Sequence, residues 1–284
     1  MVTKNIKKNI VISRILVCIA IIAIWLIGSA AIAAENVSFK GTTKIANGDF
    51  ITLTGKLTKP QGDGPFPAVV MMHGCAGINK PIDDWADKLA SWGYVALEVD
   101  SLGPRGLGDV CANPFQLPMH TRAHDAYDAK FYLSELSFVD RNRIGLMGWS
   151  HGGNGALSSV SKSNYVAFAA FIKKNSEPPK EWLPFRAAVA FYPYCIGQLD
   201  DSNAPLLILS GELDTWCPAA LCQKNKPAGK TANEVSHKIY PGAYHGFDFV
   251  GVDVVKGKHR VAYNPAAYAD SIIQIKEFFA KQMK

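Results

Sequence analysis

One pentapeptide, Gly148-Trp-Ser-His-Gly152, limits the possible folds of this chain more than any other stretch. It matches the G-x-S-x-G pattern, in which a serine occupies a strained turn between a strand and a helix. An apolar run at 144–147 precedes the motif, and small, helix-compatible residues follow at 153–160. Glycines suit the positions two residues before and after Ser150, because side chains there would collide across the tight turn. The motif predicts a strand, a sharp turn and a helix that expose Ser150; the alternative is a glycine-rich turn without chemistry.

Strand-like and helix-like patterns alternate along most of the chain. Short apolar runs indicate strands, and apolar residues repeated every three or four positions indicate helices. The predicted strands are 37–39, 51–57, 68–72, 94–99, 144–147, 186–193, 205–209 and 238–240, and the predicted helices are 85–92, 120–136, 153–160 and 265–279. The segment 161–183 is less regular, and its polar, proline-containing stretch at 173–180 predicts a loop over or beside the site.

The order of these elements predicts the α/β class. Strands that alternate with helices form a mainly parallel central sheet with helices on both faces. The Asn47-Gly48 pair between the first two strands adds an antiparallel hairpin, expected at the sheet edge. Together with the serine turn, this arrangement is typical of the α/β-hydrolase fold.

Residues 1–33 differ from the rest of the chain and read as a secretory signal peptide. Lys4, Lys7, Lys8 and Arg14 precede or begin an apolar stretch that ends in small residues at 29–34. This pattern predicts cleavage after Ala33 and export to the periplasm or the extracellular space. The alternative is an uncleaved membrane anchor at 15–34, which is long enough to span a bilayer.

Without the leader, residues 34–284 carry almost no net charge. The four leader cations account for most of the formal charge of +6, and their removal leaves 26 Lys and Arg against 24 Asp and Glu. A net charge of +2 does not favour nucleic acid as a partner. The length of 34–284 suits a single α/β-hydrolase domain. We expect no cofactor, and contact with a membrane only through an uncleaved leader.

The cysteine count points to disulfides in an oxidising compartment. Cys18 leaves with the leader, and the five that remain are Cys75, Cys111, Cys195, Cys217 and Cys222. An odd number leaves one thiol free, and sequence alone does not give the pairing. Cys75 and Cys111 both fall in loops expected at the same rim of the sheet, so a bridge between them is a hypothesis.

A serine hydroxyl needs a base and a third group that holds the base, and both are expected downstream of Ser150. His245 follows a short strand within a glycine-flanked turn, whereas His237 precedes that strand and His259 lies in a Lys/Arg cluster typical of solvated surface. Asp214 follows a buried strand and is favoured over Glu212, because its shorter side chain suits a fixed histidine partner. The predicted catalytic residues are therefore Ser150, Asp214 and His245.

The His73-Gly74-Cys75 sequence ends another buried strand, where this fold takes one oxyanion donor. We expect the backbone N–H groups of His151 and Cys75, with Gly74 as the alternative to Cys75, to bind the oxyanion. The His73 ring is expected to fix the local backbone.

Two further residues are candidates for substrate binding, namely Arg105 and Trp149. The alternative for Arg105 is an ion pair that pins its loop. His120 and His124 are four residues apart but lack a third ligand, so we interpret them as surface histidines and predict no metal site.

Five stretches together resemble the dienelactone hydrolase family. They are 70–75, 100–106, 148–153, 211–214 and 240–248, and they occur in order over most of 34–284. The resemblance implies an α/β-hydrolase with nucleophile Ser150, acid Asp214 and base His245, acting on small carboxylic esters or lactones. Ser150 stands where the founding members carry cysteine, and the acidic residue that activates that cysteine has no clear match here. The resemblance therefore implies a general carboxylesterase rather than a dienelactone-specific enzyme.

Exported proteins similar to this chain carry cysteines at the places of Cys195 and Cys222, which implies a bridge between these two and a free Cys217. Two other functions remain open. A peptidase of the prolyl-oligopeptidase type shares the Ser-acid-His order, although 34–284 leaves no room for its usual propeller. A catalytically silent member of the fold that only binds ligands is the other.

Overall fold

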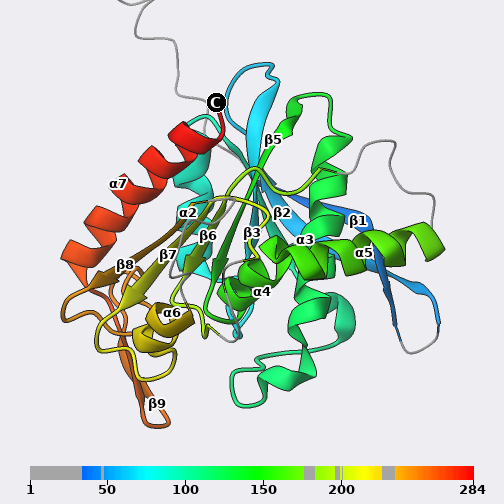
Figure 1. The fold of residues 1–284 in the computed structure, drawn as a ribbon. Helices are drawn as coiled ribbons and strands as arrows, with labels where there is room; N and C mark the ends of the chain where they lie inside the picture. Colours follow the sequence, from blue (N-terminus) through cyan, green and yellow to red (C-terminus); the bar gives the residue numbers. More distant parts are fainter. Residues whose placement is uncertain (1–33, 46–47, 176–182, 196–198, 200, 226–233) are drawn as a thin grey trace, which may run out of the picture. The chain divides into compact units, whose positions relative to one another are not determined.

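The structure is a computed structural model that describes residues 34–45, 48–175, 183–195, 199, 201–225 and 234–284 (Figure 1). Contacts divide the chain into 1–32 and a compact unit at 33–284, and the fold described here is that of the second unit. The predicted leader lies outside the described residues, so its cleavage and the anchor alternative stay predictions. Among the described helices, none is long and apolar enough to cross a bilayer.

An eight-stranded sheet forms the centre of the unit, with strand order β1-β2-β4-β3-β5-β6-β7-β8. The β1–β2 and β2–β4 pairs are antiparallel and every other neighbouring pair is parallel. The bounds are β1 Ala34–Lys44, β2 Phe50–Thr58, β3 Phe66–Met72, β4 Val95–Asp100, β5 Val139–Trp149, β6 Ala188–Phe191, β7 Leu206–Gly211 and β8 Val235–Tyr240. This confirms the α/β-hydrolase fold with a mainly parallel sheet and an antiparallel hairpin at its edge.

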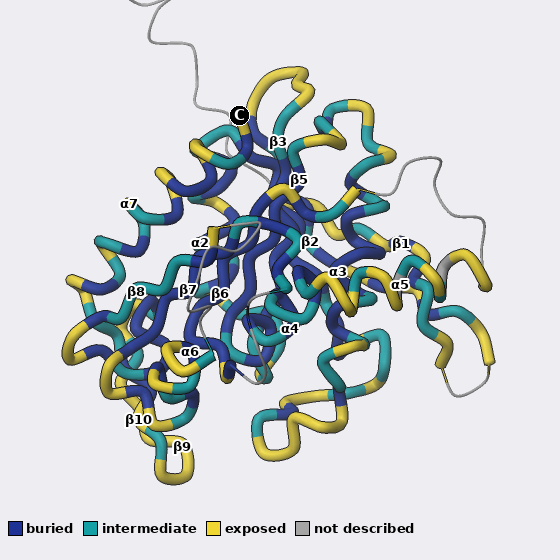
Figure 2. Tube along the Cα trace, in the orientation of Figure 1, coloured by how far each residue is buried: buried dark blue, intermediate teal, exposed yellow. Residues whose placement is uncertain are grey.

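Helices cover both faces of the sheet, as the alternation of elements predicts (Figure 1). Helices α2 (Lys80–Ser91) and α7 (Pro265–Gln282) pack on one face, and α3 (Met119–Ser134) and α4 (His151–Val160) pack on the other. Within β3, Val69 and Met71 point to the first face, while Val70 and Met72 point to the second, because strand side chains alternate. The central strands are therefore buried on both sides, as Figure 2 shows.

The parallel register brings the carboxyl ends of several strands to one edge of the sheet. Met72 of β3 pairs with Gly148 of β5, and Gly211 of β7 pairs with Tyr240 of β8. The loops that follow these strands carry the residues predicted for the site. In parallel sheets this edge is where ligands usually bind.

Some elements differ from those that the sequence predicts. Helix α5 (Lys162–Asn175) occupies part of the segment expected to be irregular, and it includes the first three residues of the expected 173–180 loop; 176–182 lie outside the described residues. Helix α6 (Ala219–Asn225), a hairpin of β9 (Asp253–Lys256) and β10 (His259–Ala262), and two short 3-10 turns at Gly103–Arg105 and Pro114–Gln116 were not predicted. The sequence did not predict them because they are too short to show a clear periodicity of hydrophobic residues.

One buried carboxyl group makes the stability of this fold depend on pH. Glu98 in β4 is 1% exposed, and burial, followed by the charge of Asp83, raises its pKa to about 8, although Lys56 opposes the shift. The folded chain then holds a proton that the unfolded chain releases, so the contribution of this group to stability is full below about pH 4.5 and is lost as pH rises through about 8. A pKa change from 4.5 to about 8 corresponds to an upper limit of about 5 kcal/mol.

We expect Glu98→Gln to remove the contribution of Glu98 to the pH dependence, because the amide has a similar shape and carries no charge to bury. The variant should be more stable than the wild type at pH 9 and equal to it near pH 4.5, as measured by urea unfolding at both values. Glu277→Gln, on the exposed side of α7, is the matched control and should behave as the wild type. Equal pH profiles for the wild type and Glu98→Gln would contradict the assignment.

Candidate active site

Ser150 lies at a strained turn between β5 and α4, as the motif predicts. Its φ of 52° and ψ of −114° lie in a region that residues other than glycine rarely adopt. A Cβ atom on Gly148 would collide with the backbone of Gly152, and one on Gly152 would collide with the end of β3 at Met72. The two glycines therefore let strand, turn and helix approach closely enough to hold Ser150 in this conformation.

A continuous hydrogen-bond chain joins Ser150, His245 and Asp214. The Ser150 Oγ lies 3.0 Å from the His245 Nε2, and the His245 Nδ1 lies 2.7 Å from the Asp214 Oδ2. Because a carboxylate can only accept, Nδ1 carries the proton and Nε2 is left to accept from the serine hydroxyl. Asp214 and His245 are 3% and 6% exposed, so water does not compete with this chain. The arrangement can move a proton from a serine hydroxyl to an imidazole.

Asp214 has two separate roles within its loop. Its Oδ2 faces His245, while its Oδ1 accepts the backbone N–H groups of Trp216 and Cys217, both at 2.8 Å. The sequence left a turn-capping role as the alternative for this residue, and the structure shows that capping and contact with histidine coexist. The cap fixes the carboxylate, which in turn fixes the imidazole.

The residues considered as alternatives to Asp214 and His245 have other hydrogen-bond partners. The Glu212 Oε2 accepts the backbone N–H of Gly242 at 2.8 Å, which ties the acid loop to the turn before His245. His237 Nε2 lies 3.0 Å from the Ser210 Oγ. His259, interpreted as solvated surface, instead stacks on Trp216 at 5.3 Å between ring centres and contacts the Thr215 hydroxyl. His259 stays partly exposed, and the contacts with Trp216 and Thr215 were not predicted, because the unpredicted β9–β10 hairpin carries His259 to the acid loop.

The ring of His73 orients the peptide between Gly74 and Cys75. Its Nε2 accepts the backbone N–H of Ser101 at 3.2 Å and lies 3.3 Å from Arg122, so Nδ1 carries the proton and donates to the Gly74 carbonyl at 2.6 Å. Burial, followed by the charge of Arg122, holds the pKa of His73 well below its usual range, so the ring stays neutral. The predicted structural role of this ring agrees with these contacts.

Holding the Gly74 carbonyl also sets the direction of the next N–H group. The carbonyl of Gly74 and the N–H of Cys75 belong to one trans peptide, so they point in opposite directions. A Cβ atom on Gly74 would lie 3.8 Å from the Ser150 Cβ, which shows that this peptide runs beside the serine. Among the hydrogen bonds between described residues, none uses the Cys75 N–H.

His151 begins helix α4, where the first backbone N–H groups have no partner within the helix. Its N–H therefore lies next to Ser150 at the positive end of the helix dipole. The His151 ring Nε2 contacts the Pro114 carbonyl at 3.2 Å. Burial, followed by the charge of Arg122, lowers the pKa of His151 to about 4, so this ring adds no charge at neutral pH.

The expectation that Arg105 binds substrate is corrected by its contacts. Its guanidinium forms a bidentate ion pair with the Asp125 carboxylate, with N–O distances of 2.7 and 2.9 Å. It also donates hydrogen bonds to the Ser101 carbonyl and the Thr43 hydroxyl. The Asp125 side chain is fully buried, so this pair is shielded from solvent. Arg105 holds the loop after β4 against α3 and β1, which is the alternative that the sequence left open.

The expectation for Trp149 is corrected in the same way, because its side chain is fully buried. Its Nε1 donates to the Asp248 Oδ2 at 2.8 Å, and that oxygen also accepts from Trp85. The Asp248 Oδ1 accepts a hydrogen bond from the Tyr192 hydroxyl at 2.7 Å. The Tyr192 ring packs on the His245 ring, with 4.4 Å between the ring centres. Asp248 thus connects the strand before Ser150 to the ring that packs on His245.

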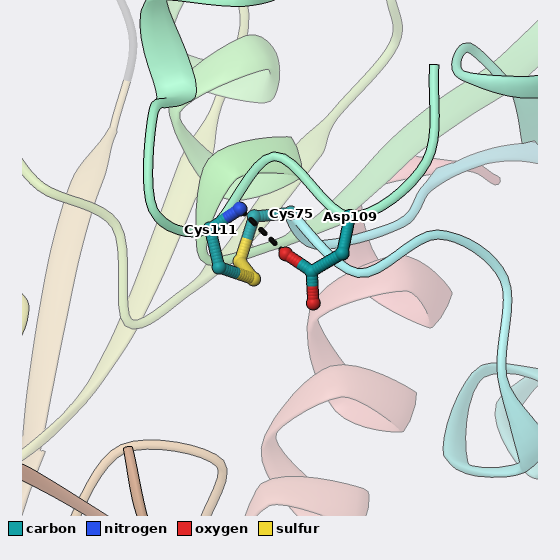
Figure 3. A group of neighbouring side chains, drawn as sticks. All are labelled: Cys75, Asp109 and Cys111. Atoms are coloured by element: carbon teal, nitrogen blue, oxygen red, sulfur yellow. Dashed lines mark hydrogen bonds between the residues drawn. A yellow bond between two sulfur atoms is a disulfide. The ribbon is translucent and has the colours of Figure 1, made fainter. Parts of the chain in front are cut away.

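Two disulfides are present, and both are the pairs expected: Cys75–Cys111 and Cys195–Cys222. Figure 3 shows Cys75 and Cys111 joined, with Asp109 beside them accepting the backbone N–H of Cys111 at 2.6 Å. The Cys75 carbonyl also accepts the Val110 N–H at 2.9 Å. The loop that reaches Pro114 is thereby fixed to the peptide that follows Gly74.

Removing the Cys75–Cys111 bridge should lower activity more than stability alone explains. We expect the Cys75→Ser/Cys111→Ser variant to lose about 10-fold in kcat, because the peptide beside Ser150 loses its link to the loop. The Cys195→Ser/Cys222→Ser variant is the control: each variant should lose about 2–4 kcal/mol of stability. Enzyme kinetics and thermal unfolding separate the two effects, and equal losses of kcat in both would contradict a specific role.

Among the cysteines that the structure describes, Cys217 is the free one, as the resemblance implies, and it is buried. Burial raises the pKa of its thiol, the charge of Asp214 raises it further, and the Ser150 hydroxyl opposes the shift. At neutral pH this thiol is protonated and is therefore a poor nucleophile.

Several residues around the site were missed by the sequence analysis. Asp248, Tyr192, Trp216 and Arg122 all contact a predicted site residue or its immediate neighbour. Asp248 lies in one of the five stretches that carry the resemblance, and its place three residues after His245 was an available signal. The other three had none, because their partners are distant in sequence.

Comparison with known proteins agrees with this architecture. The model of the dienelactone hydrolase family matches residues 53–283. A Synechocystis protein assigned as a carboxymethylenebutenolidase is 26% identical over 262 residues, which cover 88% of this chain and 100% of that protein. A Bradyrhizobium protein assigned as a 2-oxo-3-(5-oxofuran-2-ylidene)propanoate lactonase is 28% identical, and the match covers 67% of this chain and 77% of that protein.

Solved structures show the same fold. A dienelactone hydrolase from Anabaena variabilis aligns with a TM-score of 0.58 at 17% identity, covering 88% of this chain and 99% of that one. A dienelactone hydrolase-like promiscuous phosphotriesterase from metagenomic libraries aligns with a TM-score of 0.65 at 17% identity, covering 89% and 100%. Fold and family model agree over most of 34–284, and the chain belongs to the dienelactone hydrolase family as a carboxylic ester hydrolase.

Proposed function

We propose that this hydrolase cleaves ester or lactone bonds of small soluble molecules with Ser150 as nucleophile, His245 as base and Asp214 as the acid that orients the base. The observation that carries the proposal is the unbroken chain of hydrogen bonds through these three side chains, at 3.0 and 2.7 Å. The strained backbone of Ser150 supports it too, because strain of this kind concentrates at functional sites.

In the first half of the reaction, the Ser150 oxygen attacks the acyl carbon while its proton passes to the His245 Nε2. Asp214 stabilises the resulting imidazolium through the Nδ1 hydrogen bond. The tetrahedral intermediate then collapses, the bond to the leaving oxygen breaks, and His245 gives its proton to that oxygen. A lactone opens by the same step, with the leaving hydroxyl still attached to the acyl group.

The negative charge of the intermediate needs preorganised donors. We assign this role to the backbone N–H groups of His151 and Cys75, with Gly74 as the alternative to Cys75. The support is that His151 begins a helix beside Ser150, and that the held Gly74 carbonyl turns the Cys75 N–H away from His73. Losing one such donor typically costs about 3 kcal/mol in the barrier. In the second half, water attacks the acyl-enzyme with His245 again as base.

We also propose that 34–284 is a single domain that acts after export, with the leader at 1–33 removed. The support is the pair of disulfides, since disulfides persist mainly in oxidising compartments. Mass spectrometry of the secreted protein would give the N-terminus, and an N-terminal mass that still contains 15–33 would favour the anchor instead.

The deciding experiment uses p-nitrophenyl acetate and p-nitrophenyl butyrate as substrates and an organophosphonate as a covalent probe. We expect turnover of both esters, loss of turnover after phosphonylation, and a single adduct on Ser150 located by peptide mass spectrometry. A peptide p-nitroanilide should be hydrolysed far more slowly, which separates an esterase from a peptidase. Absence of both turnover and adduct would favour a silent binding protein.

A further inference from the structure

A thiol that the proposed mechanism does not use lies against the proposed acid and base. Cys217 is 5% exposed, and it is the only free cysteine among the described residues. Asp214, Cys217 and His245 can each offer one ligand atom, and these three atoms all lie within 4.8 Å of one another. A carboxylate, a thiol and an imidazole therefore meet at one point beside Ser150.

We propose that Asp214, Cys217 and His245 form a binding site for a thiophilic divalent cation such as Zn²⁺ or Cd²⁺, and that an occupied site stops ester hydrolysis. Thiolate, imidazole and carboxylate are the three side-chain types that bind zinc, and three protein ligands leave the fourth position for water. The cation is an inhibitor here, and the proposed reaction itself uses no metal. The inhibition rests on the proposed function, whereas the binding does not.

The spacing suits a tetrahedral ion after a small movement. Zinc bonds of roughly 2.0–2.3 Å place neighbouring ligand atoms roughly 3.3–3.8 Å apart. The Asp214 Oδ2 and the His245 Nδ1 are 2.7 Å apart and need to separate by roughly 0.6 Å, whereas ligand atoms as far apart as 4.8 Å need to approach by roughly 1.0–1.5 Å. The Ala262 N–H holds the His245 carbonyl at 3.0 Å and the Tyr192 ring packs on the imidazole, so the adjustment falls mainly to the side chains of Asp214 and Cys217.

The acid loop can accept a cation without unfolding. The Asp214 Oδ1 accepts two backbone N–H groups and so holds the turn from Asp214 to Cys217, and only Oδ2 faces His245. A cation that binds Oδ2 therefore leaves the turn intact. The cation displaces the proton of the Cys217 thiol to solvent, and its two positive charges then balance the Asp214 carboxylate and the thiolate, which would be costly to bury unpaired.

Occupation and catalysis exclude each other. A cation that binds the Asp214 carboxylate and the His245 imidazole replaces the hydrogen bond between them. His245 can then no longer take the Ser150 proton with the support of Asp214. Mg²⁺ and Ca²⁺ prefer oxygen ligands and higher coordination numbers, so they should not compete at a site that contains a thiolate.

The first test measures p-nitrophenyl acetate hydrolysis by the isolated protein at increasing Zn²⁺, Cd²⁺ or Mg²⁺, with each variant compared with its own metal-free rate. We expect Zn²⁺ and Cd²⁺ to inhibit the wild type at least about 10-fold, Mg²⁺ to have no effect, and a chelator to restore activity. Cys217→Ser should need at least about 10-fold more Zn²⁺ for the same inhibition. His120→Ala, an exposed histidine on α3, is the control and should respond as the wild type.

The second test needs no activity. In a Ser150→Ala background, one equivalent of Cd²⁺ should produce the ultraviolet charge-transfer absorption of a cadmium thiolate, and adding Cys217→Ser should abolish it. If that absorption is missing, or if Cys217→Ser is inhibited as strongly as the wild type, the cation site is refuted. If the absorption is present while Ser150→Ala keeps full esterase activity, the cation site stands and the proposed nucleophile is wrong.

Discussion

Replacing Ser150 with alanine is expected to lower kcat for p-nitrophenyl butyrate by about 10⁴-fold or more, because no other hydroxyl can occupy the end of the hydrogen-bond chain. The His245 imidazole lies 3.0 Å from this hydroxyl, and the Cys217 thiol beside it is protonated at neutral pH. KM and the thermal unfolding midpoint should stay near their wild-type values, since the substitution removes one oxygen and leaves the turn glycines in place. Steady-state kinetics and circular dichroism measure the two properties.

The matched control for this substitution is Ser163→Ala, which removes an exposed hydroxyl in the first turn of α5. It should keep wild-type kcat. A Ser150→Ala protein that is folded and retains more than about one hundredth of wild-type kcat would mean that the nucleophile lies elsewhere.

Asp214→Asn should lower kcat by about 10⁴-fold through the tautomer of His245 rather than through the fold. In the wild type, Oδ1 accepts the N–H groups of Trp216 and Cys217, and Oδ2 accepts from His245. An asparagine must place its carbonyl oxygen at the two N–H groups, because its NH₂ group cannot accept from them. The NH₂ group then faces the His245 Nδ1 and donates to it. The proton of the ring moves to Nε2, which can no longer accept the Ser150 proton.

Glu212→Gln is the control within the same loop. Its amide oxygen can still accept the Gly242 N–H, as the Glu212 Oε2 does at 2.8 Å, so we expect kcat within about 3-fold of the wild type. Steady-state kinetics of both variants test whether the loss is specific to Asp214, and thermal unfolding checks that both variants are folded. Equal losses at 212 and 214 would indicate a general disturbance of the loop, and a near-normal rate for Asp214→Asn would remove this aspartate from the mechanism.

The main predictions from sequence concern local geometry, and they agree with the structure. The glycines around Ser150 predict a tight strand–turn–helix, and the φ of 52° and the close approach of Met72 explain why glycine is needed. The order of short apolar runs predicts a mainly parallel sheet, because such runs are what a strand buried on both faces requires. Asp214 and His245 were selected from their places after strands, and the parallel register brings these places together.

The predictions that failed depend on where a long side chain turns or on a short element. Arg105 lies on a predicted rim loop, but its guanidinium reaches Asp125, twenty residues along the chain, rather than the site. Trp149 adjoins Ser150 in sequence, yet strand alternation turns its ring into the core, where Asp248 accepts its N–H. His259 is partly exposed, as its charged neighbours indicate, but its stacking on Trp216 was not predicted, because only the β9–β10 hairpin brings it there.

The amino-acid sequence alone determines the fold class, the strained serine turn and the set of side chains available for catalysis. Each of these depends on residues that are close along the chain, such as Gly148, Ser150 and Gly152. The tertiary structure decides which of the available groups meet. The pairing of His245 with Asp214, the support from Asp248 and Tyr192, and the place of the Cys217 thiol depend on the register of distant strands and the conformation of the loops after them. Local propensities do not encode that register, because it results from packing the whole sheet against its helices.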